Sequence, residues 1–252
     1  MPLLAINKNS GQARPISLDD CDATSQNDFI WFHSAENDIQ EEDRFFSAMR
    51  LAIDPLALAD ARRRRHPPKF ENFGNYLVLL IREIDKDDIS EAFRPNHLSI
   101  IYGEHFIYTR CTLESAAISQ CVNELQTGQV TFKSPDHLVC RIVRLISDSC
   151  NSILADIEDQ IEDIEDRILV KGTEKDLNYL LSLGNNMKKL GRSLSYQTSA
   201  IEELFQLEKA HLLHIYQDIY ENTERNASRA NLYQSIIADL INGYISINSH
   251  HL

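Results

Sequence analysis

The sequence lacks any apolar run that could cross a lipid bilayer. A membrane-spanning helix needs about 20 consecutive, mostly apolar residues, and no stretch of this chain reaches that length. Residues 1–10 also lack the basic start and the long apolar centre of a secretion signal. We therefore expect the 252-residue chain to be soluble and cytosolic.

Cysteine is scarce and is not arranged for a disulfide framework or a cysteine-based zinc site. The five cysteines are odd in number and form no CxxC pair, so we expect reduced, mostly buried thiols. The chain also has no glycine-rich phosphate loop, no nucleophile elbow and no HExxH pair. We predict that it has no catalytic residues, no enzyme activity and no tightly bound cofactor.

Positive charge is also in short supply. The chain has 25 Lys and Arg against 38 Asp and Glu, which gives a net charge of -13. Phosphate repulsion makes nucleic acid an unfavourable partner, whereas cations suit the net charge better. The basic run Arg62–His66 has no interleaved aromatic residues. We expect its arginines to pair with acidic helices in the same subunit or a neighbour.

Short apolar runs and short helical patterns in the first half of the chain predict an α/β domain. Strands are expected at Leu3–Ile6, Phe29–Phe32 and Tyr76–Ile84, and as a hairpin at Leu98–Tyr102 and Phe106–Thr109. Helices are expected at Glu41–Leu51, from Pro55 behind the capping residue Asp54, and at Leu113–Leu125. Residues 1–133 are therefore predicted to form a mainly antiparallel sheet flanked by helices.

Apolar residues with helical spacing dominate the second half. Ser134 and Pro135 mark a helix start, and the apolar pattern that follows runs without a break to Gly172. Three very long helices are expected, at Asp136–Val170, Glu174–Leu207 and Lys209–Leu252. Residues 134–252 should thus form a stalk domain, and the whole chain an α+β protein.

Acidic side chains crowd one face of the first long helix. Seven of the eleven residues 156–166 are acidic. This face is either a solvated helix surface or a surface that attracts divalent cations with their water shells. For the second interpretation, the cation-attracting side chains are Asp156, Asp159, Glu162, Asp163 and Asp166.

Small polar side chains form a stripe along the last helix. They recur at steps of four, three, four and three residues, which places them on one side of a helix: Ser235, Asp239, Asn242, Ser246 and Ser249. Apolar residues lie on both sides of this stripe, from Ile236 to Ile247. The pattern fits either an ordinary bundle helix with a few polar positions or a helix that lines a hydrated funnel or pore.

Several segments resemble the CorA family of divalent-cation transporters. Residues 55–61 (PLALADA) and 66–80 (HPPKFENFGNYLVLL) are similar to the passage of that family in which an acidic pair precedes Arg-Pro-Lys and a tyrosine-bearing strand. Ile100–Thr109 resembles its hairpin, Asp136–Leu169 its first long helix, and residues 218–223 and 240–246 its stalk helix. The resemblance covers nearly the whole chain in order.

This resemblance implies the cytosolic part of a funnel-shaped homopentamer at the cytoplasmic face of the inner (plasma) membrane. The last helix would continue past Leu252 into the first of two membrane spans. A weak intersubunit metal site is implied between Asp60 and Asn242, with Asp218 as a further carboxylate. Asn242 and Ala59 stand where the family has an aspartate and a glutamate, so Mg²⁺ would bind more weakly.

These two departures favour the zinc-transporting ZntB-like branch of the family over a magnesium or cobalt channel of the CorA type. We predict that the chain gathers divalent cations, zinc above all, and leads them towards a membrane pore along the polar stripe. An alternative from another class is a soluble coiled-coil scaffold with an α/β head and no role in transport.

Overall fold

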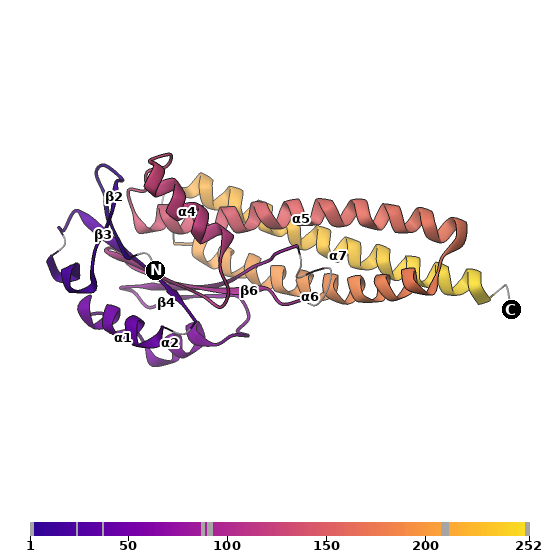
Figure 1. Ribbon diagram of the computed structural model, residues 1–252, viewed down its shortest axis with the longest axis horizontal. Helices are drawn as coiled ribbons and strands as arrows, with labels where there is room; N and C mark the ends of the chain where they lie inside the picture. The colour runs from indigo at the N-terminus through magenta and orange to yellow at the C-terminus, as the bar shows by residue number, and fades with distance from the viewer. Residues whose placement is uncertain are drawn as a thin grey trace.

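The computed structural model describes residues 3–23, 25–36, 38–86, 89, 93–207 and 212–249. A head built on one seven-stranded sheet carries three long helices that extend away from it as a rod (Figure 1). This is the α+β architecture that the sequence predicts.

The elements follow one another in two groups. The head contains β1 (Leu3–Asn7), β2 (Ala13–Pro15), the 3-10 helix η1 (Leu18–Ala23), β3 (Asp28–Ala35), α1 (Ile39–Ala48), α2 (Pro55–Arg62), β4 (Lys69–Asn72), β5 (Leu77–Glu83), β6 (Asn96–Tyr102), β7 (Phe106–Cys111) and α4 (Ala116–Thr127). The rod contains α5 (Pro135–Lys171), α6 (Glu174–Phe205) and α7 (Leu213–Ser249).

The sheet has the order β2-β1-β3-β7-β6-β5-β4. Only the β3–β7 pair is parallel, so the sheet is mainly antiparallel as predicted. Every residue of β6 and β7 is buried, because helices cover both faces of the central strands. The sequence did not reveal β2 and β4, which are short strands at the two edges with little apolar content.

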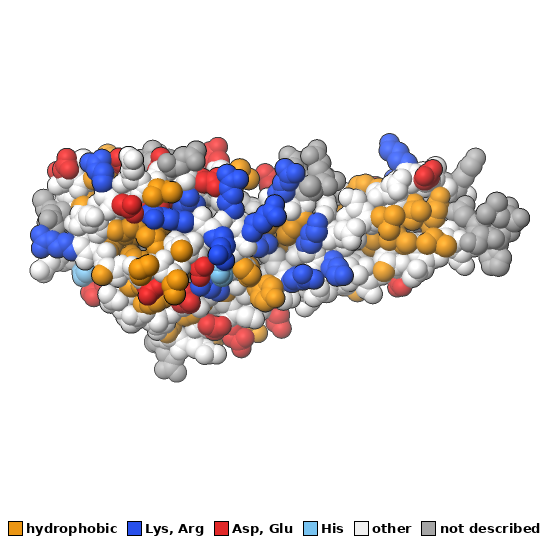
Figure 2. Space-filling view, turned by 90° about the horizontal axis from the view of Figure 1, so that it is seen from below, with side chains coloured by type: hydrophobic (Ala, Val, Ile, Leu, Met, Phe, Trp, Pro, Cys, Tyr) orange, Lys and Arg blue, Asp and Glu red, His pale blue; other side chains and the backbone are white. Residues whose placement is uncertain are grey.

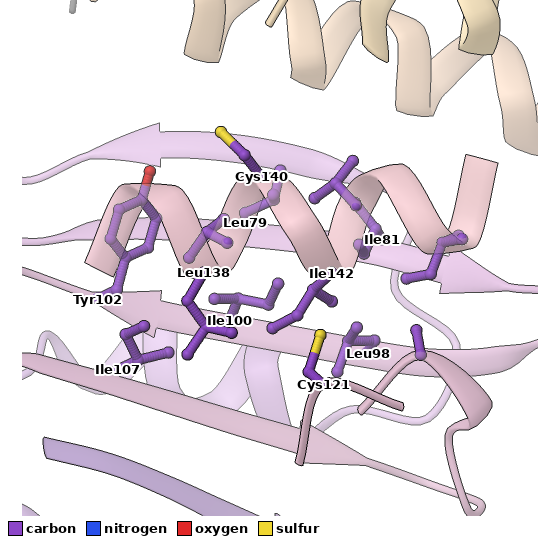
Figure 3. Close-up of a cluster of buried hydrophobic side chains, with 14 of the residues drawn as sticks. Leu79, Ile81, Leu98, Ile100, Tyr102, Ile107, Cys121, Leu138, Cys140 and Ile142 are labelled. Carbon is purple, nitrogen blue, oxygen red and sulfur yellow. The ribbon is translucent and has the colours of Figure 1, made fainter. Parts of the chain in front are cut away.

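One face of the sheet packs against α1 and α2, and the other against α4 and the ends of the rod helices nearest the head. Figure 3 shows Leu138 and Ile142 of α5 lying against Ile100 and Leu98 of β6, with Cys121 of α4 beside them. All five cysteines are free and buried, which confirms the predicted burial of the thiols. One hydrophobic core contains residues from both sides of the boundary between residues 133 and 134. The division into two domains at that boundary stays a prediction.

Helix starts were predicted well where a capping side chain marks them. Asp54 Oδ1 accepts hydrogen bonds from the backbone N–H groups of Leu56 and Ala57, and Ser134 Oγ accepts one from His137 N. Thr173 caps α6 with a complete capping box. These bonds satisfy N–H groups that have no partner within the helix.

Three helix ends differ from the prediction. α4 begins at Ala116 rather than Leu113, because Asn96 Oδ1 accepts the N–H of Leu113 at 2.9 Å and holds that residue in the loop. α1 ends before Leu51, because Arg50 takes a left-handed backbone conformation with φ of 52°. α7 is described from Leu213; its expected start at Lys209 and the chain end at Leu252 lie outside the described residues.

The rod is held together by apolar burial and by close approach of α6 and α7. Buried residues of α5, α6 and α7 form one continuous cluster along the rod. Two glycines of α6 face α7: a Cβ atom on Gly184 would lie 3.1 Å from Ile237, and one on Gly191 would lie 2.4 Å from Asn231 Oδ1. A side chain at Gly191 would therefore have to displace the side chain of Asn231.

A buried ion network ties α1 to the sheet. Glu42 is fully buried, and its Oε1 accepts hydrogen bonds from Ser34 Oγ at 2.6 Å and Arg110 Nε at 3.0 Å. Its other oxygen accepts one from Arg62 Nε at 2.8 Å. Such a network is costly to break, because removal of one member leaves a buried charge without a partner.

We expect Glu42→Ala to lower the free energy of unfolding by about 3–5 kcal/mol, because buried Arg110 would lose its carboxylate. Glu41→Ala is the matched control on the same helix, where an exposed pair with Arg44 is worth about 0.5 kcal/mol or less. Urea denaturation of both variants measures the difference. Equal losses would contradict the assigned role of the network.

Gly191→Val should cost about 1–3 kcal/mol of stability, because the new side chain overpacks the contact between α6 and α7. Gly243→Val in α7 is the control, since nothing lies within 4 Å of a Cβ atom built there. Thermal unfolding followed by circular dichroism compares them. A Gly191→Val protein as stable as Gly243→Val would show that the Asn231 side chain moves aside without cost and would contradict the predicted overpacking.

Candidate functional site

The predicted polar stripe lies on the outer surface of α7. Ser235, Asp239, Asn242 and Ser246 are all exposed, and they share the side of the helix that faces away from α5 and α6. Ser249 ends α7, and its side chain lies outside the described residues. In the single chain, therefore, the stripe contacts solvent rather than the bundle core.

The apolar residues beside the stripe divide into two sets. Ile237 is buried, and Ile236, Leu240, Ile241 and Tyr244 pack against the rod core. A second set remains exposed at the edges of the stripe: Leu232 at 56%, Ile245 at 51% and Ile247 at 42%. α7 thus presents small polar groups flanked by uncovered apolar side chains.

Asp60 lies in α2 in the head and is partly buried. Its Oδ2 accepts a hydrogen bond from Lys69 Nζ at 2.7 Å and lies 3.4 Å from His66 Nε2. The Lys69 hydrogen bond is the largest cause of the lowered pKa of this carboxyl group. The carboxylate of Asp60 is therefore ionised and is a candidate metal ligand, but a metal ion would have to share it with the ammonium group of Lys69.

Asp218 lies in the first turns of α7, about half exposed, with Arg144 Nη2 of α5 at 3.4 Å from its Oδ2. Asn242 follows 24 positions later on the same helix, which places it about 36 Å farther along the rod. One ion cannot bind both residues of one chain. The structure also places Asp60 and Asp218 on opposite faces of the sheet, since α2 packs on one face and the start of α7 on the other.

The acidic face of α5 is largely open to solvent. Asp159, Glu162, Asp163 and Asp166 are exposed, whereas Asp156 pairs with Lys86 Nζ at 2.5 Å. Within the described ranges, no three His, Cys, Asp or Glu side chains are grouped so that they could hold a metal ion. The face can raise the local concentration of cations but has no closed ligand set.

Part of the basic run pairs within the chain, as predicted. Arg62 contacts Glu42 and Asp43 of α1, and Arg64 contacts Glu36 just before that helix. Figure 2 shows further Lys and Arg side chains gathered where the head meets the rod. Three cations that line a hollow there, Arg82, Arg94 and Lys189, were not singled out from the sequence. They are far apart along the chain, so no local pattern connects them.

The comparisons with known proteins agree with this architecture. The family model described as CorA-like Mg²⁺ transporter protein matches residues 26–252. A cobalt/magnesium transport protein CorA of Thermotoga maritima is 20% identical over 219 residues, which are 82% of this chain and 60% of that protein. Part of that relative's length thus has no counterpart here. Among the residues described, no helix is long and apolar enough for a membrane span.

Two solved structures show the same fold. The CorA magnesium transporter of Methanocaldococcus jannaschii superposes with a TM-score of 0.83 at 15% identity, over 100% of this chain and 78% of the other. The ZntB cytoplasmic domain of Vibrio parahaemolyticus superposes with a TM-score of 0.74 at 16% identity, over the full length of both chains. With nine-tenths of its length matched by the family model, this chain belongs to the CorA-like Mg²⁺ transporter protein family.

Proposed function

We propose that this chain is the cytosolic part of a homo-oligomeric divalent-cation transporter, with zinc as the favoured cation. Five copies would stand side by side with their α7 helices around a hydrated axis, and membrane spans would follow Leu252. The length of the Thermotoga relative supports the further segments, because the chain spans only about 60% of it.

The observation that carries the proposal is the outer surface of α7. A polar stripe edged by exposed Leu232, Ile245 and Ile247 fits a helix whose neighbours are copies of itself. The apolar edges would pack between subunits, and Ser235, Asp239, Asn242 and Ser246 would line the funnel. Cations would be concentrated first by the acidic face of α5, whose exposed carboxylates have no closed site to retain them.

A regulatory metal site would form between two subunits. Asp60 lies in the head and Asp218 lies at the end of the rod nearest the head, on opposite faces of the sheet, so only neighbouring copies could bring them to one ion. Asn242 is about 36 Å beyond Asp218 along α7, and its amide belongs to the funnel lining rather than to this site. This reassigns Asn242 relative to the sequence-based prediction.

Zinc is favoured because the proposed intersubunit site has few carboxylates. Ala59 leaves it without a second carboxylate beside Asp60, which weakens binding of the hard Mg²⁺ ion. A magnesium or cobalt channel is the alternative within the same class.

Isotope uptake into vesicles that contain the full-length protein tests the proposal. We expect saturable Zn²⁺ uptake, compared with and without a pH gradient, and weak competition by Mg²⁺. Asp239→Asn should reduce uptake about fivefold, because loss of roughly 1 kcal/mol of attraction at the stripe corresponds to that factor. Asp239 is exposed and is the carboxylate of the stripe.

Asp19→Asn is the matched control, since it removes the same charge from an exposed position of the head. Equal uptake by the Asp239 and Asp19 variants would remove α7 from the cation path. Mg²⁺ uptake that Zn²⁺ does not reduce would overturn the zinc preference. A protein that transports neither ion would favour the scaffold alternative.

The intersubunit site is tested by measuring how well Mg²⁺ protects the full-length protein from proteolysis. Asp218→Asn should raise the Mg²⁺ concentration for half-protection about tenfold, because a carboxylate ligand is lost. Asp148→Asn is the control: both aspartates contact Arg144 and both are about half exposed, but Asp148 belongs to α5. Identical protection curves for the two variants would argue against a site at Asp218.

A further inference from the structure

A hollow of about 700 Å³ lies where the head meets the rod, and it is lined mainly by cations. Arg64 and Arg65 follow α2, Arg82 belongs to β5, Arg94 precedes β6, and Lys189 comes from the middle of α6. Figure 2 shows the concentration of Lys and Arg side chains on this face. Five cationic side chains from four separate segments thus converge in a chain that is acidic overall.

Most of this charge is not neutralised. Among the described residues that line the hollow, Glu36 is the only carboxylate, and it pairs with Arg64. Across the described part of the chain, Arg65, Arg82, Arg94 and Lys189 form no ion pair. The charge of this hollow is therefore available to an anion.

Arg82 lies at the inner wall of the hollow. Arg82 is partly buried, and its Nη2 donates to the carbonyl oxygen of His66 at 3.3 Å. Directly opposite Arg82 in the neighbouring strand, His97 is 2% exposed and neither of its ring nitrogens has a hydrogen-bond partner. His97 does not line the hollow, so a ligand there would contact Arg82 and not the imidazole.

We propose that the hollow binds a small molecule that carries several phosphate groups, a nucleoside triphosphate being the best fit. One guanidinium group can donate two parallel hydrogen bonds to two oxygens of a phosphate group. Phe93 and Leu113 add apolar surface for the nucleoside. A nucleic acid is a poor candidate, because its many phosphates would meet the net charge of -13 outside the hollow. A small ligand meets mainly charges within a Debye length of about 8 Å.

Such a ligand would contact both parts of the molecule. Arg65 and Arg94 belong to the head and Lys189 to the rod. Binding would stabilise the arrangement in which these side chains converge, so the ligand would be a regulator of the angle between head and rod. This inference is independent of which cation the protein transports.

Isothermal titration of the purified chain with ATP and with inorganic triphosphate, both without divalent metal, tests the proposal. We expect saturable binding of both probes, weakened by salt. Arg94→Gln/Lys189→Gln should weaken both at least about tenfold, because two charge-assisted contacts are lost. Both residues are exposed, so the fold should be retained, and circular dichroism checks this.

Lys188→Gln/Arg225→Gln is the matched control, with the same residue types exposed on α6 and α7 but outside the hollow. It should change affinity by less than about twofold, since its charges lie beyond direct contact with the ligand. Tighter binding of ATP than of triphosphate would support a nucleoside contact at Phe93, and equal binding would support recognition through the phosphates alone.

Three outcomes would overturn the proposal. The first is that neither probe binds saturably at millimolar concentration and low ionic strength. The second is that both double variants lose the same affinity for the probes. The third is that the Arg94/Lys189 variant shows altered self-association while neither probe binds. The last outcome would mean that the hollow receives the acidic face of α5 from a second copy. Because transport is not measured here, each outcome is distinct from failure of the proposed transport function.

Discussion

Burial of one side of α7 against α5 and α6 is the interaction on which the rest of the molecule depends. Helices of this length gain most of their stability from tertiary packing rather than from helix propensity. Ala227, Ala230, Tyr233 and Ile237 are buried in this contact, and the absence of a side chain at Gly191 lets the two helices approach closely. Since this side of α7 is used inside the bundle, the polar stripe has to face outward.

Polar contacts inside the rod fix how the helices lie relative to one another. Asn226 Nδ2 of α7 donates to the carbonyl oxygen of Ser147 in α5 at 2.9 Å. Gln197 Oε1 of α6 accepts the backbone N–H of Arg82 in the sheet at 2.9 Å, and Asn186 Nδ2 donates to the carbonyl oxygen of Ile89. Apolar packing alone would tolerate small shifts along the helices, whereas buried hydrogen bonds penalise them. Head and rod are therefore coupled, and movement between them must break or exchange such contacts.

Negative and positive side chains are concentrated in different parts of the molecule. Carboxylates on α5 remain exposed along the rod, where they can attract cations without retaining them. At the junction of head and rod, α1 neutralises Arg62 and Arg64, but the cations contributed by β5, α6 and the segment before β6 have no carboxylate partners among the described residues.

The sequence by itself determined the α+β class, the long helices and most of their starts, because capping residues such as Asp54, Ser134 and Thr173 act locally. It also placed the polar stripe on one side of α7, since helical periodicity depends on spacing alone. Only the tertiary structure decided that the apolar edges of the stripe are partly packed and partly exposed, that Asp218 and Asn242 of one chain are too far apart to share an ion, and that Arg82, Arg94 and Lys189 meet in one hollow. These facts depend on which surfaces the head and rod bury against each other, and residues distant in sequence become neighbours only through that packing.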